Sequence, residues 1–128
     1  MIQTDNRSHR SILKELARIA MTSRGLLPDF SPEAIAELDL LKPDSLLTGK
    51  IRDQRYMCWC SIDNHDSRDL DQLTVAEALP DGFNRLLVAI ADVDTLVRKG
   101  SAIDQHARQN TTSIYTTAEV FPMLPERL

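Results

Sequence analysis

Four acidic side chains lie within nine residues near the middle of the chain, namely Asp63, Asp66, Asp69 and Asp71. Carboxylates this close repel one another and destabilise a fold unless cations or hydrogen-bond donors offset them. If the end of this run is extended, Asp69 and Asp71 point to the same face, because they are two residues apart. Hard oxygen ligands on a turn are what Mg²⁺ requires, and such ions assist phosphodiester hydrolysis. The run is therefore a candidate metal site for phosphoryl chemistry.

The spacing of these aspartates also fits a solvated acidic loop. Aspartate is common in turns and helix caps, where its carboxylate accepts hydrogen bonds from nearby backbone amides. An EF-hand calcium loop is excluded, because no alignment of its pattern with these residues supplies the central glycine and the closing glutamate. Spacing alone leaves the metal site and the solvated loop as alternatives.

Four segments in order resemble the RNB domain, which is found in ribonuclease II and ribonuclease R. The acidic run from Asp63 to Gln72 is similar to the signature of that family. The resemblance continues with Val-Ala-Ile-Ala-Asp-Val at 88–93, Gly-Ser-Ala-Ile-Asp at 100–104 and Phe-Pro-Met-Leu-Pro at 121–125. Together these segments span residues 62–125, whereas residues 1–50 carry no such match.

This resemblance implies a processive 3′→5′ exoribonuclease that uses Mg²⁺ to release nucleoside 5′-monophosphates from RNA. In the family, four aspartates of the signature organise the metal and the attacking water. Three of them correspond to Asp63, Asp69 and Asp71, and we expect Asp69 and Asp71 to be catalytic. The fourth corresponds to Gln72, whose carbonyl oxygen can bind a metal but brings no charge. We therefore expect weaker metal binding at Gln72, with Asp66 as a substitute ligand or, more simply, a turn cap.

The resemblance also assigns a role to Tyr115. The family has a tyrosine at this position that packs against bases near the 3′ end of the RNA. Stacking on an aromatic ring tolerates any base, which suits an enzyme that degrades any sequence. Without the family, Tyr115 would be interpreted as a core or strand-surface residue. The implied partner is the single-stranded 3′ end of RNA.

The elements that would position these residues begin with helices. The first is predicted to start at a capping Ser8 and to end at residue 24, before Gly25. The second is predicted to open at Ser31, which precedes a proline, and to fade near residue 42. A third begins at Ser101, where Asp104 completes a start like a capping box.

Strands are expected after residue 49. Residues 56–62 and 72–79 are strand candidates on either side of the acidic run, and Pro80-Asp81-Gly82 predicts a hairpin turn. The apolar residues 86–91 are typical of a strand buried on both faces. No closing element is predicted for the tail, residues 121–128.

Composition restricts the class of protein. With 42% hydrophobic and 27% charged residues, the chain is typical of a soluble globular protein. The net charge of −4 argues against RNA binding by a basic surface alone, but a metal-dependent nuclease remains compatible with it. The only two cysteines, Cys58 and Cys60, are predicted to be small buried residues. No apolar run is long enough for a membrane span and no secretory signal opens the chain, so we expect a cytoplasmic protein without membrane contact.

These observations predict an α+β fold. We expect a helical segment and linker at residues 1–49, followed at residues 50–128 by the N-terminal part of an RNB catalytic domain, with an incomplete mixed, antiparallel-rich sheet. Because the family domain is longer, we expect the downstream half or a partner chain to be needed, and little or no activity from this polypeptide alone. The alternative is a non-catalytic RNB fragment or pseudo-nuclease that serves as an RNA-binding, protein-binding or assembly module.

Overall fold

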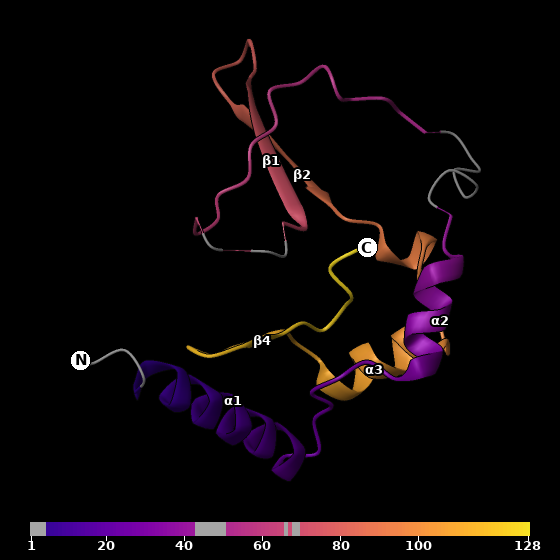
Figure 1. Ribbon diagram of the computed structural model, residues 1–128. Helices are drawn as coiled ribbons and strands as arrows, with labels where there is room; N and C mark the ends of the chain where they lie inside the picture. The colour runs from indigo at the N-terminus through magenta and orange to yellow at the C-terminus, as the bar shows by residue number, and fades with distance from the viewer. Residues whose placement is uncertain (1–4, 43–50, 66, 68–69) are drawn as a thin grey trace. The chain divides into compact units, whose positions relative to one another are not determined.

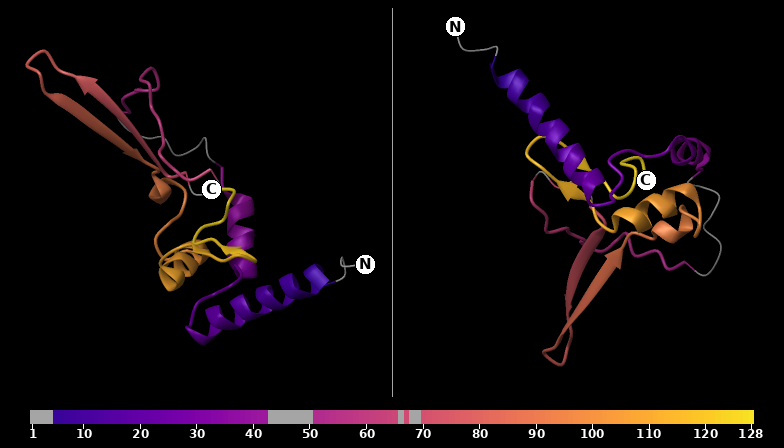
Figure 2. Two further views of the ribbon diagram at one scale, coloured as in Figure 1. Left: turned by 90° about the vertical axis from the view of Figure 1, so that its left-hand side faces the viewer. Right: turned by 90° about the horizontal axis from the view of Figure 1, so that it is seen from below.

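The chain folds into two compact units, seen here in a computed structural model that describes residues 5–42, 51–65, 67 and 70–128 (Figures 1 and 2). The first unit contains the described residues of 1–42 and 97–128, and the second contains those of 43–96. Helices and antiparallel strands are both present, so the α+β prediction is confirmed. The predicted domain division at residues 49 and 50 stays a prediction. Among the described residues, no helix is long and apolar enough to cross a membrane.

Helix α1 spans Asp5–Ser23, so the prediction that it starts at Ser8 is wrong. Its end follows the prediction, because Gly25 has a φ of +74°, the left-handed conformation that glycine adopts without strain. The amides of Gly25 and Leu26 close the last turn by donating to the carbonyls of Thr22 and Met21, both at 3.0 Å.

Helices α2 (Pro32–Leu40) and α3 (Ala102–Asn110) start at the predicted caps. The hydroxyls of Ser31 and Ser101 accept hydrogen bonds from the third residue beyond each, at 3.2 and 3.3 Å. The carboxylate of Asp104 completes the second start by accepting from the Gly100 amide at 2.7 Å. The two helices pack together, as Figure 1 shows, and small or branched apolar residues such as Ala34 and Ile103 are fully buried. This packing forms the core of the first unit.

The tail of the chain returns to the first unit. Strands β3 (Ile114–Tyr115) and β4 (Val120–Phe121) pair antiparallel, and Phe121 is buried. Beyond them, Arg127 donates to the Asp39 carboxylate and to the carbonyl of Leu38 near the end of α2. The prediction that this tail has no closing element is therefore wrong, since it is held by a short ladder and by side-chain contacts that a periodicity search does not detect.

The second unit is built on a hairpin of β1 (Gln72–Ala78) and β2 (Asn84–Ile90). The predicted turn is confirmed, because the Gly82 amide donates to Leu79 at 3.1 Å and Gly82 has a φ of +83°. A short 3₁₀ helix, η2 (Val93–Thr95), follows β2. The hairpin buries Val75 on one face.

Two predictions about this unit are wrong. Residues 86–91 are not buried on both faces, since Leu86, Val88 and Ile90 are 65%, 53% and 71% exposed. Alternate strand residues point to opposite faces, and nothing among the described residues covers the second face. Residues 56–62 form no strand, because only Cys60 pairs, in an isolated antiparallel bridge with Thr74. With the ladder limited to one bridge, both cysteines are exposed and not buried as predicted. Between them, the indole nitrogen of Trp59 donates to the Gln54 carbonyl at 2.9 Å.

Candidate functional site

The acidic run lies between two backbone contacts with the hairpin. At its start, Cys60 exchanges two hydrogen bonds with Thr74, with N···O distances of 3.0 and 2.8 Å. At its end, the Asp71 carbonyl accepts from the Ala91 amide at 2.8 Å, which extends the β1–β2 ladder by one step. Both ends of the run are therefore fixed to the same hairpin.

The predicted ligands occupy different parts of this loop. Asp63 and Asp71 are described and exposed, and Gln72 is the exposed first residue of β1. Asp69 and Asp66 lie outside the described residues. Within the described part of the chain, no group of three or more histidine, cysteine, aspartate or glutamate side chains is placed to hold a metal ion. The assignment of metal ligands and catalytic residues thus stays a prediction.

Tyr115 lies in the first unit, on β3, where its backbone is opposite Val120. Its side chain is 51% exposed, whereas Phe121 on the facing strand is buried. The ladder thus presents the tyrosine ring toward solvent and anchors itself through the phenylalanine. A half-exposed ring is available for stacking, although its role in RNA binding stays a prediction.

The first unit also contains a buried polar cluster that sequence reasoning missed. Asn110, 1% exposed, accepts from the Leu27 amide at 2.8 Å and donates to the Leu27 carbonyl at 2.9 Å. Its amide nitrogen also lies 3.1 Å from Nε2 of His106, which is 4% exposed and packs against the ring of Phe30. Burial lowers the pKa of His106, and the nearby Pro122 backbone offsets part of that effect, although Nδ1 of the ring has no hydrogen-bond partner among the described residues.

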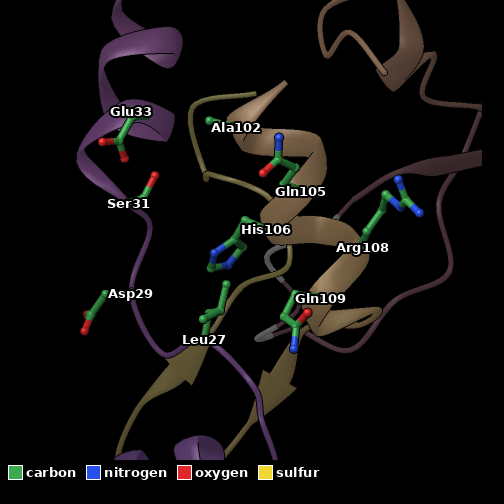
Figure 3. A pocket seen from close by; sticks show the side chains of 9 residues that line it. All are labelled: Leu27, Asp29, Ser31, Glu33, Ala102, Gln105, His106, Arg108 and Gln109. Carbon is green, nitrogen blue, oxygen red and sulfur yellow. The ribbon is translucent and has the colours of Figure 1, made fainter. Parts of the chain in front are cut away.

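A cavity of about 800 Å³ adjoins this cluster. Figure 3 shows the side chain of His106 pointing from α3 toward the segment that carries Leu27 and Ser31. The lining is polar and of mixed charge, with Asp29 and Glu33 on one side and Arg108 on the other. Asp29 is already paired with Arg18. The mixture of charges does not select a particular ligand, and we assign this cavity no binding role.

Comparison with known proteins identifies the family that residues 51–128 resemble. The family model described as "RNB domain" matches residues 51–128. Ribonuclease R of Acidithiobacillus ferrooxidans is 39% identical over 113 residues, which cover 86% of this chain and 25% of the relative. The DIS3-like exonuclease 2 of Xenopus tropicalis is 43% identical over 79 residues, covering 62% of this chain and 10% of the relative.

Solved structures agree with the sequence matches. The structure of Mycoplasma genitalium RNase R in complex with double-stranded RNA has a TM-score of 0.74 and 29% identity. The similarity covers 84% of this chain and 19% of that one, so it extends over part of residues 1–50 as well. The chain spans a quarter or less of the length of the relatives that it matches.

Proposed function

The chain belongs to the RNB domain family, and on this basis we propose that it carries the metal-binding part of a Mg²⁺-dependent 3′→5′ exoribonuclease. The substrate would be the single-stranded 3′ end of RNA and the products nucleoside 5′-monophosphates. Asp63, Asp69, Asp71 and Gln72 would be the metal ligands, with Asp69 and Asp71 catalytic. Tyr115 would stack on a base near the 3′ end.

The observation that carries this proposal is that both ends of the acidic run are held on one hairpin, by the bridge between Cys60 and Thr74 and by the hydrogen bond from the Ala91 amide to the Asp71 carbonyl. Asp63 follows Cys60 by three residues, and Asp71 precedes Thr74 by three. Two exposed carboxylates tethered to the same bridge could share one cation. Without a cation, the repulsion between two neighbouring carboxylates lowers stability. A bound cation relieves that repulsion, and binding is therefore favoured.

The donors present fit Mg²⁺. Exposed carboxylates at Asp63 and Asp71, with the amide oxygen of Gln72 next in sequence, are hard oxygen ligands that a hydrated ion can reach. When bound, Mg²⁺ would supply positive charge beside the phosphate that is cleaved. The chain's own contribution is to hold these oxygens on a fixed backbone, since the Asp71 carbonyl is tied to β2 through Ala91.

A location in the cytoplasm is part of the same proposal. Both cysteines are unpaired and exposed. Exposed thiols persist in a reducing compartment and are uncommon in secreted proteins, where disulfides form. The proposed RNA substrate is compatible with this compartment.

Titration with Mg²⁺ tests the metal site. We expect Mg²⁺ to raise the thermal midpoint of the 128-residue chain, because a ligand that binds only the folded state stabilises it. Asp71→Asn should abolish that shift, while Asp94→Asn, the same change at an exposed position in η2, should preserve it. Gln72→Asp should strengthen Mg²⁺ binding about thirtyfold, since a unit charge about 4 Å from a divalent ion contributes about 2 kcal/mol even in water.

A second candidate is a non-catalytic RNB fragment that acts as an RNA-binding, protein-binding or assembly module. The observation that favours it is the exposed apolar face of β2, formed by Leu86, Val88 and Ile90. The neutral side chain of Gln72 at a ligand position supports it too. The Mg²⁺ titration discriminates between the two, because a thermal midpoint that Mg²⁺ leaves unchanged, also in Gln72→Asp, would favour the module over the nuclease.

A further inference from the structure

The ladder that presents Tyr115 is too short to hold its own shape. Strands β3 and β4 contain two residues each. Even a longer two-stranded hairpin is only marginally stable in water. Contacts outside the ladder must therefore fix where the Tyr115 ring lies.

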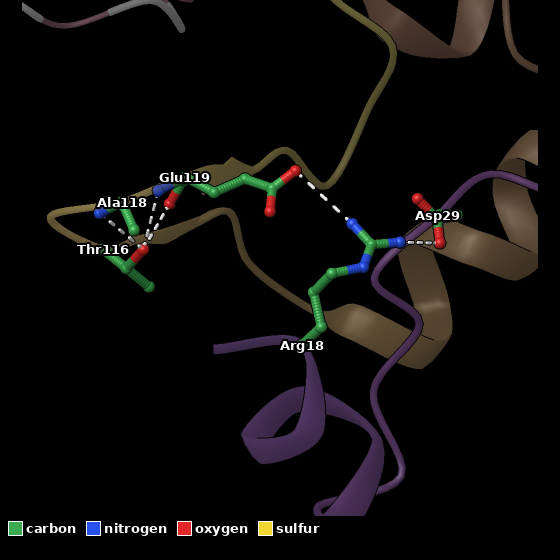
Figure 4. Close-up of polar contacts among 5 residues, drawn as sticks. All are labelled: Arg18, Asp29, Thr116, Ala118 and Glu119. Carbon is green, nitrogen blue, oxygen red and sulfur yellow. Dashed lines mark hydrogen bonds and ion pairs between the residues drawn. The ribbon is translucent and has the colours of Figure 1, made fainter. Parts of the chain in front are cut away.

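The turn that joins the strands is closed by one hydroxyl (Figure 4). The Thr116 Oγ1 accepts from the amides of Ala118 and Glu119 at 3.3 and 3.0 Å and donates to the Glu119 carbonyl at 2.6 Å. The Thr116 amide also donates to the Glu119 carbonyl, at 3.1 Å. These bonds fix the internal conformation of the turn, but they do not attach it to the rest of the unit.

One guanidinium attaches the turn to the N-terminal helix. Arg18 on α1 donates from Nη1 to the Glu119 carboxylate at 3.4 Å and from Nη2 to the carboxylate of Asp29 (Figure 4). The Arg18 and Glu119 side chains are 35% and 27% exposed, so this contact is shielded more than a typical surface pair. A planar fork that engages two carboxylates loses less freedom per hydrogen bond than a lysine would.

The contact between Arg18 and Glu119 lies next to Tyr115 in the β3–β4 ladder. Glu119 precedes Val120, and Val120 is the residue opposite Tyr115. A shift of the Glu119 backbone would therefore move the partner of Tyr115 directly. Because the ladder has only two pairs, it offers little resistance to such a shift.

We propose that Arg18 is a positioning residue for Tyr115. By holding Glu119, it keeps the β3–β4 hairpin where the half-exposed ring of Tyr115 can receive an RNA base. This inference rests on the proposed RNA-binding role of Tyr115. It assigns a role in RNA binding to α1, which lies outside the region that the RNB family model matches.

Fluorine NMR tests the positioning without RNA. The chain has two tyrosines, so incorporation of 3-fluorotyrosine gives two signals. Tyr56, exposed and in the other unit, is an internal reference. We expect Arg18→Ala to shift or broaden the Tyr115 signal and to speed amide exchange at Thr116 by about threefold to tenfold.

Two variants sharpen this measurement. Glu119→Gln should reproduce the effect of Arg18→Ala, because it removes the charge that the guanidinium holds. Arg24→Ala should leave Tyr115 unchanged, because the Arg24 side chain, just beyond α1, donates to the Ala20 carbonyl of that helix. Circular dichroism verifies that each variant is folded. A Tyr115 signal and a Thr116 exchange rate that Arg18→Ala leaves unaltered would overturn the inference.

A double-mutant cycle connects the positioning to RNA. Affinity for a fluorescent single-stranded oligoadenylate is measured for the unmodified chain, Arg18→Ala, Tyr115→Ala and the double variant. We expect Arg18→Ala to weaken binding about threefold to fivefold with Tyr115 present and to add nothing in Tyr115→Ala. Independent, additive losses would overturn the inference alone. No RNA binding by the unmodified chain, or no loss in Tyr115→Ala, would overturn the proposed role of Tyr115 and the inference with it.

Discussion

Asn110 uses both ends of its side-chain amide to bind one backbone residue. Its oxygen accepts from the Leu27 amide and its nitrogen donates to the Leu27 carbonyl, so the orientation of the amide is determined by its partners. The remaining N–H of Asn110 faces Nε2 of His106. Since an amide nitrogen only donates, Nε2 must accept and the imidazole must be neutral, with its proton on Nδ1.

This arrangement predicts a loss of stability in acid. Burial lowers the pKa of His106 below its ordinary value of 6.5, so in the window below about pH 6.5 the unfolded chain binds a proton that the folded chain does not. The neutral imidazole of His106 therefore contributes its full stabilisation of the folded state above that pH. As the pH falls, this stabilisation decreases by at most about 1.4 kcal/mol per pH unit for one proton. Urea unfolding between about pH 7.5 and 5.5 measures it.

Variants separate His106 from the other titrating groups. We expect His106→Gln to flatten the pH dependence of the unfolding free energy, even if it lowers stability at every pH. His9→Gln, the same change at an exposed position on α1, is the matched variant for comparison. Equal slopes in His106→Gln and the unmodified chain would contradict the assignment.

At the scale of elements, the end of α3 carries a conformational cost. Thr111 follows the helix with a φ of +61°, and its amide donates to the Ala107 carbonyl at 2.7 Å. A β-branched residue is strained in this left-handed region, where glycine is not. We expect Thr111→Gly to raise the free energy of unfolding by about 0.5–1 kcal/mol, after the entropy that glycine adds to the unfolded chain. Chemical denaturation measures the change, and Thr112→Gly, whose backbone is not left-handed, should lower stability instead.

Local sequence signals were sufficient to predict those elements whose formation depends on their own residues. Ser31 and Ser101 marked the starts of α2 and α3 because a hydroxyl cap acts within one turn. The sequence around Gly82 marked the β1–β2 turn for the same reason, since the turn needs a positive φ at one position. Such features need no knowledge of the tertiary structure.

Elements that depend on distant contacts were missed or misjudged. The β3–β4 ladder has too few residues for a periodic pattern and depends on contacts such as that between Arg18 and Glu119, 101 residues apart. Residues 56–62 have strand-like composition, yet their one pairing is between Cys60 and Thr74. Burial on both faces was inferred from apolar content alone, which does not determine what covers a strand.

The functional residues show the same difference between local motifs and distant contacts. Asp63, Asp71 and Gln72 were found through the ordered motifs of the RNB domain, and spacing alone left a metal site and a solvated loop open. The cluster of His106 and Asn110 gave no signal in sequence, because its partner Leu27 is 83 residues from Asn110. A polar residue at the end of a helix is ordinarily exposed, and only the tertiary structure shows that this one is buried.

At the scale of the whole molecule, the matched relatives are at least four times longer than the region that resembles them. We therefore expect the 128-residue chain alone to release mononucleotides from a 3′-tailed RNA at least about a thousandfold more slowly than full-length ribonuclease R of Acidithiobacillus ferrooxidans. Removal of even one preorganised charged group from an active site costs about a hundredfold to a thousandfold in rate. Thin-layer separation of labelled nucleotides measures both rates, and comparable rates would show that these residues suffice for catalysis.

The division of the chain into two units also determines what optical measurements can report. The three α-helices described all belong to the first unit, whereas Trp59, the single tryptophan, belongs to the second. Far-ultraviolet circular dichroism will therefore be dominated by the first unit, and tryptophan emission will follow the second alone. Melting curves from the two signals, recorded on one unlabelled sample, would coincide if the units unfold together and separate if each has its own transition.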